Sequence, residues 1–213
     1  MAKREHLALF KRDVILWNRW REKNAKVRPD LTHADFSGQD LRGLDLSQAD
    51  LMEADFSDAN LIRTNFMEAN LSGANLNNAI LMKAELNNAV LRGANLSDAD
   101  PSKADLRDAD LQGTQMINAD AEQANGVGAN LSNSDLTGSN FRKASLIRAN
   151  LSQSDLSNAD FTEAVLVRAN LQGATLTGSN FTKANLSGAD LTGADLTGAI
   201  LKGATMPNGA IHQ

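Results

Sequence analysis

Large apolar residues recur at every fifth position along most of this chain. Of the 36 positions between Leu31 and Met206 whose numbers end in 1 or 6, 25 are Leu, six are Phe and two are Met. Pro101, Ala121 and Gly126 are the exceptions, and no insertion or deletion interrupts the period. A period of five fits neither a helix nor a strand. The pattern therefore predicts a solenoid, in which each pentapeptide forms one side of a coil and the coils stack through backbone hydrogen bonds.

Small and polar residues keep the same period. Two residues before each of the 36 sites stands Ala in 27 cases and Ser or Thr in six, and directly before the site stands Asp or Asn in 27. A narrow tube has room for one large and one small side chain per side. We therefore expect the Leu and Ala side chains to point inward and the Asp and Asn side chains to point outward.

Glycine marks the predicted corners. Thirteen of the 15 glycines lie among the 36 positions from 33 to 208 whose numbers end in 3 or 8, and six more of these 36 positions are Asn. The third residue of a type II turn has a positive φ, which Gly adopts freely and Asn more easily than most residues. We expect type II corners throughout, and the most regular ones between Gly173 and Gly203, where six of seven such positions are Gly.

The repeated unit is a small residue, Asp or Asn, Leu or Phe, and two variable residues, and it is cleanest in residues 184–204, ANLSG ADLTG ADLTG AILKG A. This unit resembles the pentapeptide-repeat family, which is especially abundant in cyanobacteria. The resemblance implies an all-β solenoid: a right-handed, four-sided parallel β-helix of about nine coils and on the order of 40 Å in length. We expect a cap helix in residues 1–28, the β-helix in 29–206 and a short tail in 207–213.

The N-terminal segment predicts the only α-helix. Phe10, Val14 and Trp17 recur at helical spacing with Trp20 beside them. The first coil of a solenoid exposes its hydrophobic bore and an unpaired strand edge, so we interpret these four residues as a cap. The alternative is a basic amphipathic helix on an anionic membrane surface. We favour the cap because the helix leads directly into the first coil through Pro29.

Candidate catalytic and metal-binding residues are scarce. The chain has no Cys, which excludes disulfides and thiolate chemistry, and its three histidines, His6, His33 and His212, do not have metal-ligand spacing. No Ser or Thr has an identifiable base, and the glycines follow the corners rather than a phosphate loop. We expect no enzyme, no metal and no cofactor. No apolar stretch is long enough to span a membrane and no signal-peptide core is evident, so the expected compartment is the cytoplasm.

Outward acidic residues form a second periodic feature. Fourteen repeats from Asp35 to Asp195 carry Asp before the core residue, and stacked coils would place many of them about 4.8 Å apart. Such ladders could bind cations or imitate nucleic-acid phosphates. Asn takes the same place 12 times, which favours a local role in satisfying backbone groups at the turns. We expect no direct nucleic-acid binding.

The stretch 111–130 breaks the regular pattern. With four sides per coil, Pro101 and Ala121 occupy one core column, one coil apart. The next core positions of that column are aromatic and form a core ladder: Phe141, Phe161 and Phe181. We expect the rings to fill part of the space left by Ala121. At Gly126 we expect a void or a local bend, and the alternative is a ligand pocket.

Outward-facing hydrophobic residues indicate a surface for a partner. One set lies one residue after the core site at intervals of 20, with a further valine beside it: Val127, Ile147, Val167 and Val165. Ile80 and Met82 form a smaller patch elsewhere. A contiguous apolar strip on a soluble rod is typical of an interface.

The sequence favours a non-catalytic protein-interaction scaffold or regulator with an unidentified protein partner. The family resemblance implies an alternative, a DNA-mimicking protein that binds type II topoisomerases, although such members dimerise through a C-terminal helix that this sequence does not show. A second alternative is a membrane-surface adaptor that uses the basic helix. We expect the last coil either to pair with its counterpart in a homodimer or to be covered only by residues 207–211.

Overall fold

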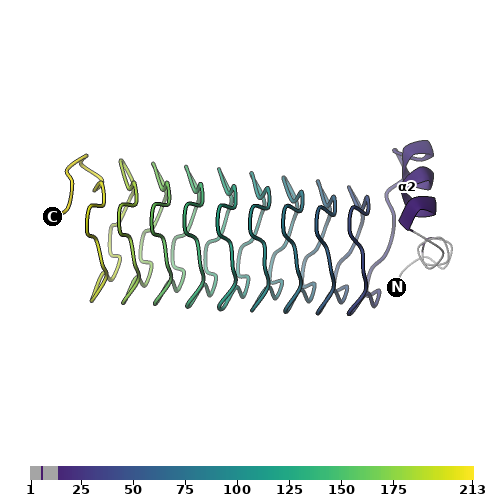
Figure 1. Ribbon diagram of the computed structural model, residues 1–213, viewed down its shortest axis with the longest axis horizontal. Helices are drawn as coiled ribbons and strands as arrows, with labels where there is room; N and C mark the ends of the chain where they lie inside the picture. The colour runs from purple at the N-terminus through teal and green to yellow at the C-terminus, as the bar shows by residue number, and fades with distance from the viewer. Residues whose placement is uncertain (1–5, 7–13) are drawn as a thin grey trace.

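The computed structural model describes residue 6 and residues 14–213 and consists of one short helix followed by a long coiled rod (Figure 1). The helix α2 spans Val14–Lys23 and lies at one end of the rod, and the C-terminal tail lies at the other. Phe10 of the predicted cap lies outside the described residues. Within the described part, no helix has the length and apolar character needed to cross a bilayer.

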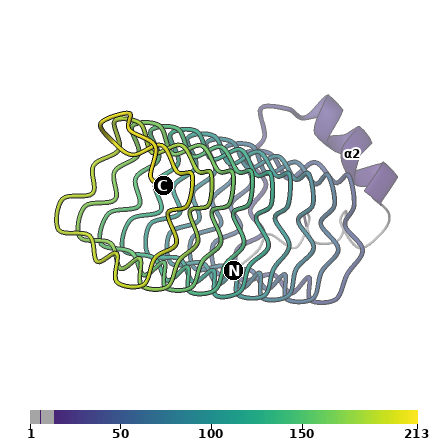
Figure 2. The same cartoon turned by 60° about the vertical axis from the view of Figure 1, so that its left-hand side comes forward.

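The coils repeat every 20 residues. Parallel bridges join residue pairs such as Asp30 and Asp50 or Asn185 and Thr205, always 20 apart, so each coil contains four pentapeptides and the rod has about nine coils. Each side contributes one bridging residue rather than a longer strand. We call residues 30–34 the first side, 35–39 the second, 40–44 the third and 45–49 the fourth, each recurring every 20 residues. Figure 2 looks obliquely along the rod and shows successive coils lying behind one another.

Leucine and alanine side chains fill the interior. From Leu31 to Leu186, every leucine of the five-residue period is no more than 3% exposed. The core ladder stacks in parallel: the ring centroids of Phe141 and Phe161 lie 5.3 Å apart, and those of Phe161 and Phe181 lie 5.0 Å apart, with 7° between the ring planes in each pair. The predicted four-sided β-helix with an apolar interior is therefore present.

Corners have the same backbone conformation along the whole rod. The third corner residue has a positive φ in every repeat from His33 to Gly203, at 53–60° in 22 residues with side chains and 63–72° in the 13 glycines. The expectation that the glycine-rich last coils have the most regular corners is wrong. A left-handed conformation destabilises a residue with a side chain by about 1–2 kcal/mol. From His33 to Gly188, each of these corner residues offsets this cost because its N–H donates to a carbonyl of the next coil, as His33 N does to Met52 O at 2.9 Å.

The irregular stretch neither bends nor interrupts the stack. Gly126 N donates to Ser145 O at 2.7 Å and Gly128 N to Ile147 O at 2.9 Å, as in regular repeats. A Cβ on residue 126 would stand 2.9 Å from Leu146 Cδ2, so the next coil fills the space beside this glycine. The expected bend is therefore absent. Pro101 has no N–H to donate, and Asp120 N keeps its bond to Ala99 O at 2.9 Å.

The helix α2 is bonded to the first coil. Trp17 is fully buried, and its Nε1 donates to Asp45 O at 2.6 Å. Asn18 Nδ2 donates to Gly43 O at 2.9 Å, and Arg21 Nη2 donates to Ser47 O at 2.8 Å. Trp20 packs beside Trp17, with 5.3 Å between the two ring centroids. Val14 begins the helix, and its side chain lies outside the described part of the chain.

The C-terminal tail covers one side of the last coil. It turns back and pairs antiparallel, with Met206 N donating to Ala210 O at 2.7 Å and His212 N donating to Ala204 O at 2.8 Å. The core leucines of this coil nevertheless remain only half-buried: Leu191, Leu196 and Leu201. The homodimer through this coil stays a prediction.

Candidate interaction surfaces

The outward Asp and Asn side chains hold the corners. All 27 of them, 15 Asp and 12 Asn, accept a hydrogen bond at Oδ1 from the backbone N–H two residues later. This confirms the local role inferred from the interchange of Asp and Asn. At Asp35, hydrogen bonds from the Ser37 hydroxyl and backbone N–H lower the pKa of the carboxyl.

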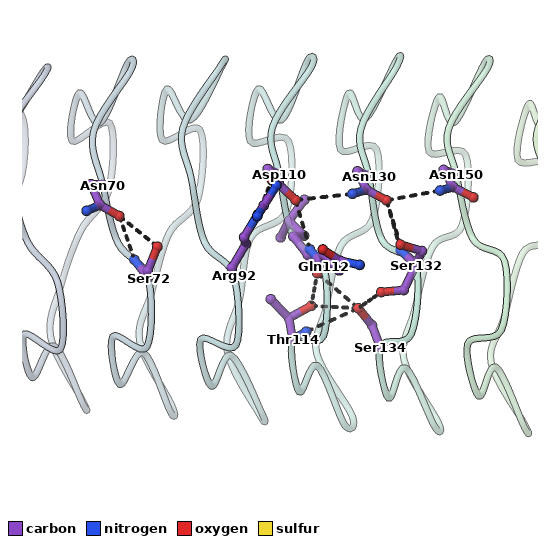
Figure 3. A network of polar contacts seen from close by, with 11 residues as sticks. Asn70, Ser72, Arg92, Asp110, Gln112, Thr114, Asn130, Ser132, Ser134 and Asn150 are labelled. Carbon is purple, nitrogen blue, oxygen red and sulfur yellow. Dashed lines mark hydrogen bonds and ion pairs between the residues drawn. The ribbon is translucent and has the colours of Figure 1, made fainter.

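Amide side chains link these positions between coils. In Figure 3, Asn130 Nδ2 donates to Asp110 Oδ1 at 3.2 Å, and Asn150 Nδ2 donates to Asn130 Oδ1 at 3.1 Å. Each amide brings a donor into a column that would otherwise contain only acceptors, which relieves repulsion between stacked oxygens. Within the described residues, no group of three or more His, Cys, Asp or Glu is arranged to hold a metal ion.

Inward hydroxyl groups on the first side are engaged by the backbone. Ser134, which is labelled in Figure 3, donates through Oγ to Leu111 O at 2.9 Å. In the next coil, Ser154 Oγ donates to Leu131 O at 2.7 Å. Both serines are no more than 3% exposed. These hydroxyls therefore satisfy buried carbonyls and do not face solvent as nucleophiles would.

Charge is divided unequally among the four sides. The second side carries seven carboxylates and no Lys or Arg, and its acids are Asp35, Asp55, Asp58, Asp98, Asp135, Asp155 and Asp195. The third side carries eight of the rod's 12 basic residues: Arg42, Arg63, Lys83, Lys103, Arg142, Lys143, Lys183 and Lys202. The fourth side carries three, and they are Arg107, Arg148 and Arg168. The rod therefore presents chemically different faces to partners.

The predicted apolar strip lies on the fourth side. Its column residues are half-buried and follow one another in adjacent coils: Val127, Ile147 and Val167, with Val165 at the bridging position of the same side. Arg148 N donates to Val167 O at 2.9 Å, which joins two of these coils. The Arg148 and Arg168 side chains beside the strip are exposed and have no side-chain partner in the described part of the chain. From residue 125 onward the fourth side has no carboxylate.

Sequence reasoning missed a groove on the third side. It has a volume of about 630 Å³ and is lined by Asp40, Arg42, Gly43, Ile62, Arg63, Met82 and Lys83. Ile80 lies on the same side and is 39% exposed. The sequence indicates only a small apolar patch at Ile80 and Met82. The groove could have been found from the spacing of 20 residues that aligns Met82 with Ile62 and Arg42.

One ion pair lies in this groove. Arg42 Nη2 donates to Asp40 Oδ2 at 2.6 Å, and Arg42 Nε donates to Asp40 Oδ1 at 2.8 Å. These bonds lower the pKa of the Asp40 carboxyl and raise the pKa of the Arg42 guanidinium. Arg63 and Lys83 form no ion pair or side-chain hydrogen bond with any described residue. The groove therefore keeps two unneutralised cations.

Ile15 and Leu16 of α2 are exposed, although Trp17 beside them is buried. The hydrogen bonds of Trp17, Asn18 and Arg21 hold this helix against the first coil. The membrane-surface alternative for the basic helix stays a prediction, because residues 7–13 lie outside the described part.

The family model for pentapeptide repeats matches residues 30–67, 69–106, 104–142, 144–182 and 169–208. Among solved structures, the chain is similar to HetL, a pentapeptide repeat protein involved in heterocyst differentiation regulation from the cyanobacterium Nostoc sp., with 35% identity over 91% of this chain and 98% of that chain and a TM-score of 0.33. It is also similar to a pentapeptide repeat protein of the Arabidopsis thaliana thylakoid lumen, with 30% identity, coverage of 61% and 69%, and a TM-score of 0.32.

A third similar structure is QnrB1, a plasmid-mediated fluoroquinolone resistance protein, with 22% identity over 79% of this chain and 90% of that chain and a TM-score of 0.34. None of the curated proteins matches the chain.

Proposed function

The chain belongs to the pentapeptide repeat family, and from this premise we propose that it is a non-catalytic scaffold that binds another protein through the sides of its rod. The interior is filled by Leu, Ala and Phe side chains, so a partner meets the protein at its outer surface. The observation that carries the proposal is the apolar strip on the fourth side, together with the exposed Arg148 and Arg168 beside it.

The composition of this area supports an interface. In other coils the same column holds Met67 and polar residues such as Ser47, Asn87 and Ser187, so the repeat has no structural need for Val or Ile here. The buried core of an interface is more apolar than the remaining surface, and interfaces are enriched in Arg and depleted in Lys, Glu and Asp. A partner can bury the strip and at the same time neutralise the two guanidinium groups.

Changing Ile147 to Asp is expected to lower the recovery of specific partners from native lysate at least tenfold, because it places a carboxylate in the centre of the strip. Partners captured by the immobilised protein would be quantified by mass spectrometry after crosslinking. The matched control is Asn87→Asp, which introduces the same charge at the same corner position of the fourth side, three coils away. Equal recovery with both variants and with the unchanged protein contradicts the proposal.

The acidic second side favours one other function, DNA mimicry directed at a type II topoisomerase. Seven carboxylates along one side, with no cation among them, resemble a row of phosphates. If this function holds, micromolar protein inhibits DNA supercoiling by bacterial gyrase, and Asp58→Asn with Asp98→Asn weakens the inhibition. Asn78, Asn118 and Asn158 occupy the same column, so both replacements suit the corner. Unchanged supercoiling at micromolar protein dismisses this alternative.

A further inference from the structure

We propose that the groove on the third side binds an extended acidic segment of a partner protein that carries a large apolar side chain. The inference rests on the scaffold function proposed above and names the chemistry of a second contact. It follows from three features of the groove: its shape, its uncompensated charge and its apolar lining.

The groove runs along the rod over three coils. Arg42, Ile62 and Met82 form one column of its lining, and Gly43, Arg63 and Lys83 form the next. At the end nearest α2, a Cβ on Gly43 would meet no atom within 4 Å, so this end is open. With about 4.8 Å between coils, the lining extends over roughly 10 Å.

The unpaired positive charge of the groove favours an anionic ligand. Asp40 is the one carboxylate of the lining, and Arg42 already holds both of its oxygens. Arg63 and Lys83 are exposed, follow each other in one column and lack a side-chain partner among the described residues. Like charges in directly stacked positions repel each other. A carboxylate between these two side chains would relieve that repulsion.

The apolar lining of the groove favours a ligand that also carries an apolar side chain. Ile62 and Met82 are half-buried, and Ile80 beside them is exposed. Other coils place Ser102, Thr162 or Thr182 at the position of Ile62 and Met82. The apolar side chains are therefore not required by the fold. Met adapts its shape to an irregular partner, so this pair suits one Leu-sized side chain.

An extended peptide fits these features better than a nucleic acid or a membrane. Side chains on one face of a strand recur about every 6.8 Å, so a lining of roughly 10 Å accepts one acidic and one apolar side chain two residues apart. Asp100, Asp120 and Glu122 follow farther along the same side. These carboxylates interrupt the row of basic residues beyond the groove, so the uninterrupted basic stretch is too short to follow a nucleic-acid backbone or to lie flat on a lipid surface.

Residues at equivalent positions of other coils show which substitutions in the groove the fold tolerates. Glu163 occupies the same corner column as Arg63 and Lys83 with a φ of 60°, so Arg63→Glu and Lys83→Glu suit the fold. Thr162 and Thr182 occupy the column of Ile62 and Met82, so Ile62→Thr and Met82→Thr suit the fold as well. Lys143→Glu with Lys183→Glu is the matched control, because it reverses two charges of the same column outside the groove.

The probe is a fluorescein-labelled peptide, Ser-Glu-Ser-Leu-Ser-Glu-Ser, whose Glu and Leu side chains share one face when the peptide is extended. Its binding to the full chain is measured by fluorescence anisotropy at several salt concentrations. We expect saturable binding that weakens with salt, at least a tenfold loss with Arg63→Glu and Lys83→Glu, and a several-fold loss with Ile62→Thr and Met82→Thr. The control pair should change affinity less than twofold. Methyl NMR should show the Met82 signal shifting upon addition of peptide.

Several results would overturn the inference. They are the absence of saturable binding at millimolar peptide, equal binding of a peptide with Ser in place of Leu, and an equal loss in the control pair. Stronger binding of a single-stranded oligonucleotide or of phosphatidylglycerol vesicles would assign the groove to another occupant. If the peptide fails to bind while Ile147→Asp still loses its partners, the groove inference falls and the scaffold function stands.

Discussion

Replacing Trp17 with alanine is expected to lower the free energy of unfolding by about 3–5 kcal/mol. The indole is fully buried between α2 and the first coil, and its loss also leaves Asp45 O without the Nε1 donor. Urea unfolding followed by circular dichroism measures the change. Since Trp17, Asn18 and Arg21 bond to backbone carbonyls at the edge of the first coil, loss of this helix contact should also let the variant associate end to end, which sedimentation velocity detects.

The control for this prediction is Leu16→Ala. Leu16 neighbours Trp17 in the same helix but is 46% exposed, so its replacement should change the stability by less than about 0.5 kcal/mol. A Trp17→Ala variant as stable and as monomeric as the unchanged protein would show that the helix does not protect the first coil.

Replacing Phe161 with alanine is expected to destabilise the rod by a similar amount, about 3–5 kcal/mol. Its ring is fully buried and lies parallel to the rings of Phe141 and Phe181, so both stacking contacts disappear and a cavity opens. In a solenoid each coil contacts only its neighbours. Amide hydrogen exchange should therefore accelerate in residues 140–185 and stay unchanged in residues 30–70.

Phe161→Leu separates stacking from volume. Leucine fills 25 of the 36 equivalent sites, so it suits the interior. Phe161→Leu should therefore destabilise the rod less than Phe161→Ala, and this loss of stability measures mainly the two ring contacts, each worth about 0.5–1.5 kcal/mol. If Phe161→Ala and Phe161→Leu were equally stable, or if exchange accelerated uniformly along the chain, the local stacking account would be wrong.

The repeat made most of the architecture predictable. Each Leu, Ala and Asp performs the same task in every unit, so one correct assignment of inward and outward positions holds for the whole rod. The role of Asp and Asn could be inferred because two residues that differ in charge, but share a side-chain oxygen, alternate at one position. The corners were misjudged, since Lys183 or Glu163 adopts nearly the same positive φ as the glycines. Glycine frequency reflects the ease of a turn, whereas the conformation is imposed by the stacked coils.

The candidate surfaces were less predictable. The strip on the fourth side could be located from intervals of 20, because its members are all apolar and equally placed. The groove combines apolar and charged residues from two columns. Its preference for an anionic ligand depends on which of its basic side chains are already paired with a carboxylate. Arg42 pairs with Asp40, while Arg63 has no such partner although it is exposed in the next coil.

The sequence by itself determined the coil, the contents of its interior and the outward columns, because a strict period of five allows only one set of side chains to be buried together. Only the tertiary structure decided how the rod ends and where its surface is hollow. Trp17 donates a hydrogen bond to Asp45 O, 28 residues farther along the chain, and the tail pairs with Ala204. The Leu146 side chain occupies the space beside Gly126. These contacts depend on side-chain directions and on groups without a counterpart in the repeat, which a periodic pattern does not encode.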